Sequence, residues 1–402
     1  MVCKTYELKV DKSHLSKETL DTLRRLFLEA KWFYNNMIAK GEVFHFDYKS
    51  KIVEVRNKDG KLETRVILCL SSQMRQEIVE RAKNAIRGLA HLKKKGYKVG
   101  PLKFKSRIGS IPLRQYGRTH RISDDRVVIQ NVKQRMRIRG LNQIPDGAEL
   151  ANATLQQRYD NYFIHITTFQ TPIERPSPGK AIGVDAGIRH QLTLSNGLQL
   201  DESIPMTKKL KHLHKELSKR TLHGKNWFKT SAKLNKEYGR QTNQRTDIRH
   251  KVVSELVSRY DSVAVQDDNI AGWQRMWGRR VATSAIGGIM RDLKTKSHTP
   301  VVIGRFEPTS RKCSNCGATK EVSLEERSFL CDSCGLHIDR DLNAAINVWR
   351  AIPAERREFT PVDMKAATEI LGYFNGIPSV SASLVEEAGS RSLATRPGFG
   401  SW

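Results

Sequence analysis

Hydrophobic and polar residues alternate near the start of the chain and then change to a helical spacing. Residues 5–10, Thr-Tyr-Glu-Leu-Lys-Val, alternate as a half-buried strand does. Across residues 17–40 the apolar side chains recur every three or four positions, which predicts an amphipathic helix. An inserted hairpin is expected within 44–70, with its turn at 57–60, and a second helix at 71–91. The N-terminal part therefore predicts a strand, two helices and an inserted hairpin.

Residues 101–170 have a different pattern, with short basic strands separated by turn residues. Strands are expected at 103–105, 126–130, 135–139, 152–156 and 162–168. Such a series is typical of a small barrel, and we expect the opening strand to join it, so that the two helices form an insertion. The three prolines in Pro172–Pro178 indicate a linker.

A new unit begins at Ala181 with an apolar strand that ends in a carboxylate. From there the expected order is strand, strand, strand, two helices (206–221 and 227–260), strand, helix (282–296), strand and helix. Polar or acidic residues close the apolar strands, and this layout is that of an RNase H-like fold, in which carboxylates meet at one edge. Residues 379–402 are rich in Ser, Gly and Ala, which predicts a disordered tail.

The net charge of the chain restricts its possible functions more than its residue composition does. Lys and Arg total 70 against 42 Asp and Glu, a net charge of +28, which predicts a polyanionic partner such as nucleic acid. No apolar run approaches the length of a bilayer span, so we expect no membrane partner. The first residues show no signal-peptide pattern, and we expect a cytoplasmic protein.

Four cysteines form two Cys-x-x-Cys pairs, at Cys313, Cys316, Cys331 and Cys334. This spacing suits four thiolates around a tetrahedral Zn²⁺, and an all-cysteine site is structural because it leaves no open position. Two disulfides are the alternative, which a reducing compartment disfavours. Cys3 and Cys69 lie in apolar sequence and are expected to be core thiols. The catalytic groups must therefore come from outside the four-cysteine segment.

Two carboxylates stand out near this segment. Asp185 follows Ile-Gly-Val in an apolar strand, where an unpaired charge is costly unless a cation compensates it. The alternative for Asp185 is a strand-end residue that caps a turn. Asp341 opens the last helix of the pattern, where N-cap duty is the alternative. Carboxylates from separate elements are the ligands that Mg²⁺ needs, and two ions can activate water and stabilise a leaving oxygen of a phosphodiester.

Three motifs together resemble the RuvC and zinc-ribbon portion of the TnpB family of transposon-encoded RNA-guided nucleases, which are related to compact type V CRISPR effectors. They are Val184-Asp-Ala-Gly-Ile188, the four cysteines, and the segment Asp339-Arg-Asp-Leu-Asn-Ala-Ala-Ile-Asn347. The resemblance covers roughly residues 181–350. It implies that Asp185 and Asp341 are catalytic Mg²⁺ ligands and that the four cysteines bind structural Zn²⁺.

The resemblance also implies a domain plan. The expected fold class is multidomain α/β: an RNase H-like (RuvC) nuclease domain with an inserted zinc ribbon, and an N-terminal β-barrel wedge domain with a helical insertion. The expected boundaries are a wedge domain at 1–10 and 93–172, a helical recognition insertion at 11–92, a nuclease domain at 173–378 with its ribbon at about 308–338, and the tail at 379–402.

Gln266 departs from the family pattern, because it stands where the family usually has a catalytic glutamate. An amide keeps the shape of the carboxylate but is a poor bridging ligand for Mg²⁺. Four interpretations remain open: an isosteric replacement that traps an uncut complex, a naturally inactive nucleic-acid-binding protein, substitution by Asp268, or substitution by Glu307. Ion pairs of Glu307 with Arg305 or Arg311 are the alternative to the last. Position 266 stays among the expected catalytic residues with Asp185 and Asp341.

The expected activity is cleavage of double-stranded DNA that matches a guide RNA, next to a short motif, by hydrolysis with two Mg²⁺ ions. Base pairing would select the sequence while the basic chain holds the phosphates. A monomer is favoured. The alternatives are a nuclease-dead, repressor-like RNA-guided protein and a zinc-ribbon transposon accessory protein that binds DNA without RNA.

Overall fold

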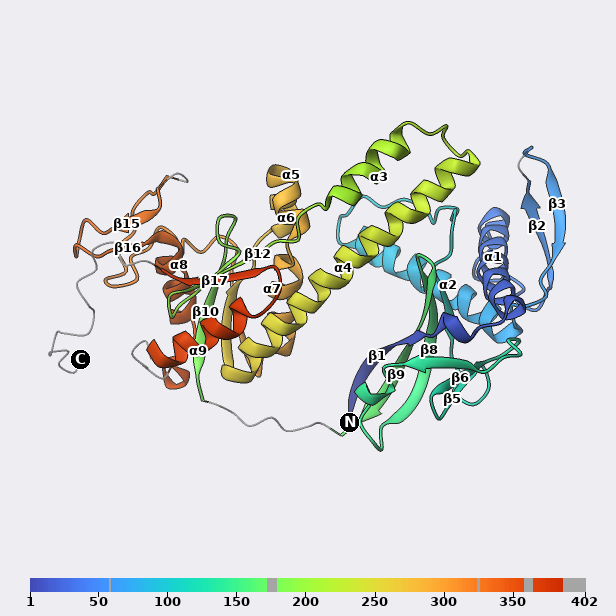
Figure 1. Cartoon of the computed structure of the whole chain (residues 1–402), viewed down its shortest axis with the longest axis horizontal. Coiled ribbons are helices and arrows are strands. Elements are labelled where there is room, and N and C mark those ends of the chain that lie inside the picture. Colours follow the sequence, from blue (N-terminus) through green and yellow to red (C-terminus); the bar gives the residue numbers. More distant parts are fainter. Residues whose placement is uncertain (58, 172–178, 324–325, 358–363, 386–402) are drawn as a thin grey trace. The chain divides into compact units, whose positions relative to one another are not determined.

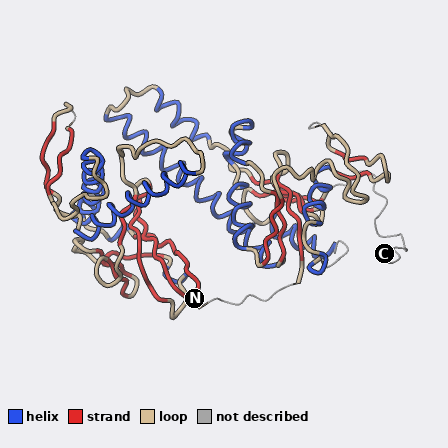
Figure 2. The backbone as a smooth tube through the Cα atoms, turned by 180° about the vertical axis from the view of Figure 1, so that it is seen from behind, coloured by secondary structure: helices blue, strands red, loops and turns tan. Residues whose placement is uncertain are grey.

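The structure is a computed structural model that describes residues 1–57, 59–171, 179–323, 326–357 and 364–385. The chain divides into two compact units, Met1–Glu174 and Arg175–Trp402, each with its own sheet and helices (Figures 1 and 2). The expected linker at 172–178 lies outside the described residues. Each unit is described by itself.

The first unit is built on a seven-stranded sheet in the order β4-β8-β9-β1-β7-β6-β5. The opening strand β1 (Val2–Val10) lies inside this sheet, antiparallel to β9 and β7, as the alternation predicts. The imidazole Nε2 of His120, on edge strand β5, lies 3.1 Å from the Ala151 carbonyl oxygen of β8, so the sheet is a nearly closed barrel. The other strands are β4 (Ser110–Leu113), β5 (His120–Ser123), β6 (Arg126–Ile129), β7 (Met136–Arg139), β8 (Glu149–Arg158) and β9 (Asn161–Gln170).

One expected strand of this barrel is wrong. Residues 103–105 are irregular, and the strand lies at β4 instead, where Ile111 and Leu113 are fully buried against the core. The Lys103-Phe-Lys105 alternation is misleading because Phe104 is 64% exposed. Alternation over three residues is too short to fix a strand without the burial of its apolar member.

Two helices, α1 (Lys17–Lys40) and α2 (Ser72–Lys94), interrupt the barrel sequence. Each begins at a serine cap: Ser16 accepts a hydrogen bond from the Thr19 N–H, and Ser71 from the Met74 N–H. The hairpin of β2 (Ile52–Arg56) and β3 (Leu62–Val66) lies between them. Its exit is tied to α1 by Glu29, a buried carboxylate that accepts the backbone N–H groups of residues 68–70 at 2.8–3.0 Å.

The second unit contains a six-stranded sheet in the order β14-β13-β10-β11-β12-β17. Three strands are parallel: β10 (Ala181–Ala186), β13 (Ser262–Gln266) and β14 (Thr299–Ile303). Their register pairs Val184 with Val265 and Gln266 with Ile303, so their carboxyl ends meet at one edge of the sheet. The antiparallel members are β11 (Leu192–Leu194), β12 (Leu198–Glu202) and β17 (Val380–Leu384).

The helices of this unit follow the predicted order with shifted ends, and the segment before β14 is divided. The helix expected from 282 begins at Ile286, and two short helices that were not predicted come before it. The bounds are α3 (Lys208–Ser218), α4 (Lys225–Arg259), α5 (Ile270–Trp277), α6 (Arg279–Thr283), α7 (Ile286–Lys296), α8 (Arg340–Arg350) and α9 (Met364–Asn375). A two-stranded sheet of β15 (Ser328–Leu330) and β16 (His337–Asp339) precedes α8.

The prediction of a disordered tail from 379 is wrong at its beginning. Val380–Leu384 forms β17, which pairs along β12, and Ala382 is buried. The apolar residues of α9, among them Phe374, fill the core beneath this strand. Residues 386–402 lie outside the described residues. Among the helices of the described ranges, none combines the length and apolar character that a membrane span requires.

Candidate functional site

Helix α8 packs against β10, the first strand of the second unit, with almost no space between the backbones. A Cβ added at Gly183 of β10 would lie 2.5 Å from the Trp349 nitrogen and 2.7 Å from the Trp349 Cβ, and it would also overlap the Ala345 carbonyl oxygen. Only glycine allows this approach. Two strand residues beyond Gly183 and one helical turn before Ala345 both span roughly 6 Å, so Asp185 and Asp341 meet.

The pKa of the Asp185 carboxyl group reflects the acidic side chains near it. Burial, followed by the negative charges of Asp341 and Asp268, raises the pKa of Asp185 well above its ordinary value. A carboxyl group whose pKa is raised by neighbouring negative charges lies near those charges. The structure therefore brings together two of the predicted residues, Asp185 and Asp341, and adds Asp268.

Asp341 does not serve as the helix cap. The N-cap of α8 is Asp339, whose carboxylate accepts hydrogen bonds from the Asp341 and Leu342 N–H groups, both at 2.9 Å. The alternative role considered for Asp341 thus belongs to its neighbour. The Asp341 carboxylate instead has an ion pair with Arg340 at 3.4 Å, and its side chain is 18% exposed.

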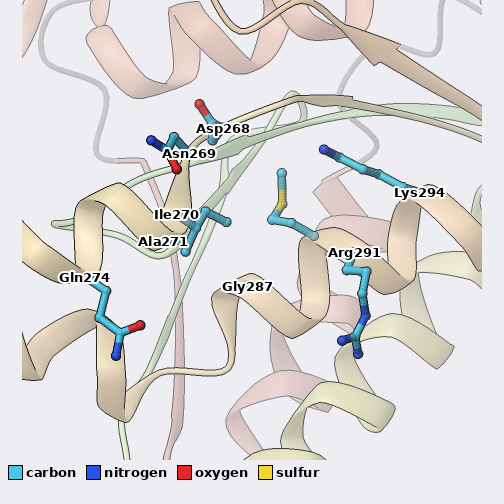
Figure 3. A pocket seen from close by; sticks show the side chains of 9 residues that line it. Asp268, Asn269, Ile270, Ala271, Gln274, Gly287, Arg291 and Lys294 are labelled. Atoms are coloured by element: carbon cyan, nitrogen blue, oxygen red, sulfur yellow. The ribbon is translucent and has the colours of Figure 1, made fainter. Parts of the chain in front are cut away.

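Asp268 lies two residues beyond the end of β13, just before α5. Its Oδ2 is buried and has no hydrogen-bond partner. Burial raises the pKa of Asp268 to about 6, although the Lys294 charge acts against the shift. Asp268 borders a cavity of about 450 Å³ between α5 and α7, with Arg291 and Lys294 on its far side (Figure 3). A buried oxygen without a partner is the kind of ligand that a cation would satisfy.

Gln266 is held by hydrogen bonds that only an amide can make. Its Nε2 donates to the carbonyl oxygens of Gly304 and Arg305, both at 3.2 Å. It also donates to the Glu307 carbonyl oxygen at 3.0 Å, while its Oε1 accepts from the Thr309 hydroxyl at 3.0 Å. The residue is only 6% exposed. Its side chain thus fastens the turn after β14.

Glu307 is exposed on that same turn. The two arginines considered as its partners bind other acids: Arg305 pairs with Asp267 at 3.6 Å, and Arg311 pairs with Glu321 at 3.0 Å. Neither ion pair expected of Glu307 is therefore formed. The negative charges that raise the pKa of Asp185 include that of Asp268 but not that of Glu307.

The four cysteines form a compact cluster. Their sulfur atoms all lie within 4.8 Å of one another, with Cys313–Cys334 and Cys316–Cys331 distances of 3.6 Å. The structure forms no disulfide among them. A tetrahedral Zn²⁺ with bonds of about 2.3 Å would space its sulfurs about 3.8 Å apart, so the residues fit the ion. Within the described ranges, no set of three or more carboxylates has its oxygen atoms as close together as these sulfurs.

Two asparagines of α8 join the ribbon to the helix, a role that the sequence did not reveal. Asn343 is fully buried; its amide accepts from the Ser314 N–H at 2.9 Å and donates to the Lys312 carbonyl at 2.8 Å. Asn347 donates to the Thr309 carbonyl at 2.8 Å and to that of Lys312 at 2.6 Å. With Gln266, these amides fasten the whole segment from β14 to the first cysteine.

Two family models match this chain. One, OrfB_IS605, described as "Probable transposase", covers residues 164–276, which include β10 and β13. The other, described as "Cas12f1-like, TNB domain", covers residues 293–348, which include the four cysteines and most of α8. The matched regions thus hold every residue of the predicted site.

Individual proteins agree with these models. A "Putative RNA-guided DNA endonuclease" from Streptomyces pristinaespiralis is 28% identical over 225 residues, 53% of this chain and 56% of that protein. "TnpB-like protein L79" from Acanthamoeba polyphaga mimivirus is 27% identical over 188 residues, 41% of this chain and 36% of that protein. The chain thus spans about half or less of these relatives' lengths.

Among solved structures, the Cas12f1 chain of a "Cas12f1-sgRNA-target DNA complex" aligns over 84% of this chain and 83% of its own length, with a TM-score of 0.47 and 13% identity. The resemblance to TnpB rests on the family models and the relatives rather than on this alignment. Those matches confirm the resemblance: the part of the chain that carries the carboxylates and the four cysteines is similar to TnpB-type proteins.

Proposed function

We propose that this chain is an RNA-guided DNA endonuclease, which as one protein copy with its guide RNA cleaves matching double-stranded DNA with Mg²⁺. The observation that carries the proposal is the place of Asp185 on β10 beside α8, where burial and the negative charges of Asp341 and Asp268 raise its pKa. A carboxyl group whose charged form is destabilised in this way is typical of a site that binds a cation. The proposal assigns the second unit to the RNase H-like class, and the barrel with its helical insertion to the wedge and recognition roles.

Mg²⁺ is the cation that best fits this set of donors, because it prefers oxygen ligands and a few carboxylates suffice to hold it. Bound there, two ions would supply an activated water and stabilisation of the leaving oxygen. The protein's own part is to aim the carboxylates: β10 fixes Asp185, and the close packing of α8 at Gly183 fixes Asp341. Asp339 satisfies the helix N-terminus, which leaves the Asp341 carboxylate for the site.

The third carboxylate is Asp268 or Glu307, and Gln266 serves as a positioning residue. A glutamate at 266 would face three carbonyl oxygens that now accept hydrogen bonds from the amide. These hydrogen bonds favour the interpretation that Gln266 is a structural residue of this fold. They disfavour the interpretation that Gln266 replaces a charged metal ligand in a working nuclease. Asp268 is supported by its buried, unpartnered oxygen, and Glu307 by its place on the turn that Gln266 fastens.

The basic residues of the chain would hold nucleic acid through its phosphates, while base pairing selects the target. With a net charge of +28, binding should weaken steeply as salt rises, because each neutralised phosphate releases counterions. The relatives' names support this assignment: the Streptomyces pristinaespiralis protein is named as an RNA-guided DNA endonuclease.

The test uses protein purified with the RNA that it retains when expressed with its flanking DNA. Cleavage of a plasmid library that carries the matching target is compared for the parent, Asp185→Ala, Asp268→Asn, Glu307→Gln and Gln266→Glu. Mg²⁺-dependent cleavage that is lost with Asp185→Ala supports the proposal, and the two acid variants identify the third carboxylate. Absence of cleavage by both the parent and Gln266→Glu would sink the nuclease assignment.

Gln266 also supports a second candidate, a nuclease-dead RNA-guided protein that binds DNA without cutting it. That protein would retain RNA of defined length and bind the matching target, yet none of the variants would cut. A transposon accessory protein without RNA would retain no such RNA. Sequencing of the co-purified RNA therefore separates the last candidate from the first two.

A further inference from the structure

The helical hairpin of α3 and α4 has a small core of its own. Leu210 and Leu213 of α3 pack against Leu234 of α4, and all three are buried. The rings of His214 and Tyr238 add a hydrogen bond of 2.6 Å between the two helices. In Figure 1 the two helices lie side by side, and their connection lies far from the sheet of the same unit. The two helices therefore hold each other in a helical hairpin whose connecting end is exposed.

Aromatic rings gather at that end, which we call the aromatic tip and define as residues 222–228. The rings of His223, Trp227 and Phe228 contact one another, with centroids 5.2–6.1 Å apart. Phe228 is 55% exposed and Leu222 is 66% exposed. His223 has a left-handed backbone, with φ of 63°, which turns the connection so that its ring stacks on Phe228. The three rings thus form a packed cluster in which the ring of Phe228 is exposed to solvent.

Positive charge surrounds the aromatic tip. Residues 208–236 contain nine lysines and one arginine against a single acid, Glu216. Lys219, Lys225 and Lys229 are exposed beside the rings, and none of them has an acidic partner within the part of the chain that the structure describes. Exposed rings among unpaired cations are the two components that proteins use to hold single strands: stacking for the bases and charge for the phosphates.

We propose that the aromatic tip binds a single-stranded polynucleotide, with an unpaired base stacked on the exposed ring of Phe228. A duplex is a poor partner for this surface because its base faces are already stacked on one another. The proposal rests on the proposed function only for the source of the strand, which would be an unpaired segment of guide RNA or a displaced strand of the DNA target. Both offer the same chemistry.

The experiment uses the full chain and two probes, a fluorescent oligouridylate and an oligothymidylate of equal length, with a DNA duplex as the reference ligand. Binding is measured by anisotropy for the parent, Phe228→Ala and Trp227→Ala/Phe228→Ala. The matched control is Phe104→Ala, which removes a ring that is 64% exposed in the other unit. We expect single-strand affinity to fall about tenfold in the aromatic-tip variants, with duplex affinity and the control unchanged.

Charge is tested separately with Lys225→Gln/Lys229→Gln. This variant should lower the salt dependence of single-strand binding by about 1.4 in log–log slope, the value for two phosphate contacts. Photo-crosslinking of a 4-thiouridine probe should place RNA on the peptide with Phe228. The probe that binds more tightly, RNA or DNA, identifies the source of the strand.

Unchanged single-strand affinity in Phe228→Ala, or crosslinks that all lie elsewhere, would overturn the proposal. An equal loss for duplex and single strands would overturn it as well, because it would show that the rings only maintain the hairpin. None of these measurements requires cleavage. A chain that cuts no DNA but binds single strands through Phe228 contradicts the nuclease assignment alone, and a chain that cuts while its variants bind normally contradicts this inference alone.

Discussion

The four-cysteine ribbon and the carboxylate edge are both candidate cation sites, but they are assembled in opposite ways. The sulfurs of the ribbon lie within 4.8 Å of one another, and its two knuckles end in glycines with positive φ, Gly317 and Gly335. Each knuckle is closed by local backbone bonds such as Gly317 N–H to the Cys313 carbonyl at 3.0 Å. The carboxylates come from β10, the start of α5 and α8, and they repel one another.

The two sites differ in the free energy that is needed to bring their ligand atoms together. Without metal, burial raises the pKa of the Cys313 thiol, while the hydrogen bond from Asn315 lowers that of Cys334 to about 6, so the cluster carries less charge than four metal-bound thiolates would. Carboxylates in a buried site lose their hydration and repel one another as anions, which raises the pKa of Asp185 and opposes the packing that brings them together. The protein counters that repulsion with contacts of neutral groups: the Gly183 packing and the amides of Gln266, Asn343 and Asn347.

Removal of zinc should have the largest effect on the stability of the chain. Cys331→Ser, or chelation of the parent, should unfold the ribbon, because structural zinc contributes on the order of 10 kcal/mol in isolated zinc-finger peptides. Zinc content by mass spectrometry and hydrogen exchange at α8 measure the result. Cys69→Ser, a thiol of the other unit that is not part of the cluster, is the control and should retain zinc. A ribbon that stays protected without metal would contradict the account.

Gly183→Ala should have the next largest effect. The added methyl group would overlap the backbone of α8, so we expect the free energy of unfolding to fall by about 3 kcal/mol. Gly372→Ala, where a Cβ meets nothing within 4 Å, is the matched control. Urea denaturation measures both. Equal stability of the two variants would show that α8 does not need its close approach to β10.

Gln266→Glu should lower the free energy of unfolding by about 2 kcal/mol, because it replaces an amide donor with an acceptor among three carbonyl oxygens. Thr309→Val, which removes the hydroxyl that donates to Gln266, should cost less. Hydrogen exchange across residues 304–314 should rise in both variants. A Gln266→Glu chain that is as stable as the parent and cuts better would favour the interpretation that a charge had been removed from a working site.

The smallest expected effect is a dependence of stability on pH. The pKa of Asp268 is raised from 3.8 to about 6 in the folded state, so the folded chain binds its proton more tightly than the unfolded chain does. Stability should therefore fall as pH rises from about 4 to about 6, by on the order of 2 kcal/mol for this group. Asp268→Asn should flatten that slope in chelator.

Asp267 provides the internal control for this slope. The hydrogen bond from Lys294 lowers the pKa of Asp267, so its contribution to stability is lost as pH falls rather than as it rises. Asp267→Asn should thus change the pH dependence in the opposite direction from Asp268→Asn. Variants that shift the curve in the same direction would contradict the assignment of Asp268 to the buried edge.

The sequence predicted what local pattern determines. The opening strand, α1, the cysteine knuckles and the apolar strand that ends at Asp185 all follow from spacing. It could not predict the role of Gln266, because a glutamine in an apolar strand gives no sign of the carbonyl oxygens that surround it 38–41 residues later. Nor could it show that Asp339 rather than Asp341 caps α8, since both stand where a helix begins.

The most direct test of the central claim, that the carboxylate edge cuts while the ribbon supports it, is single-turnover cleavage by RNA-loaded Asp185→Asn. Target binding and zinc content are measured on the same preparation. The account predicts normal binding, a full complement of zinc and a loss of Mg²⁺-dependent cleavage of at least about a thousandfold. Cleavage at the rate of the parent, with Asp185 neutral, would contradict it.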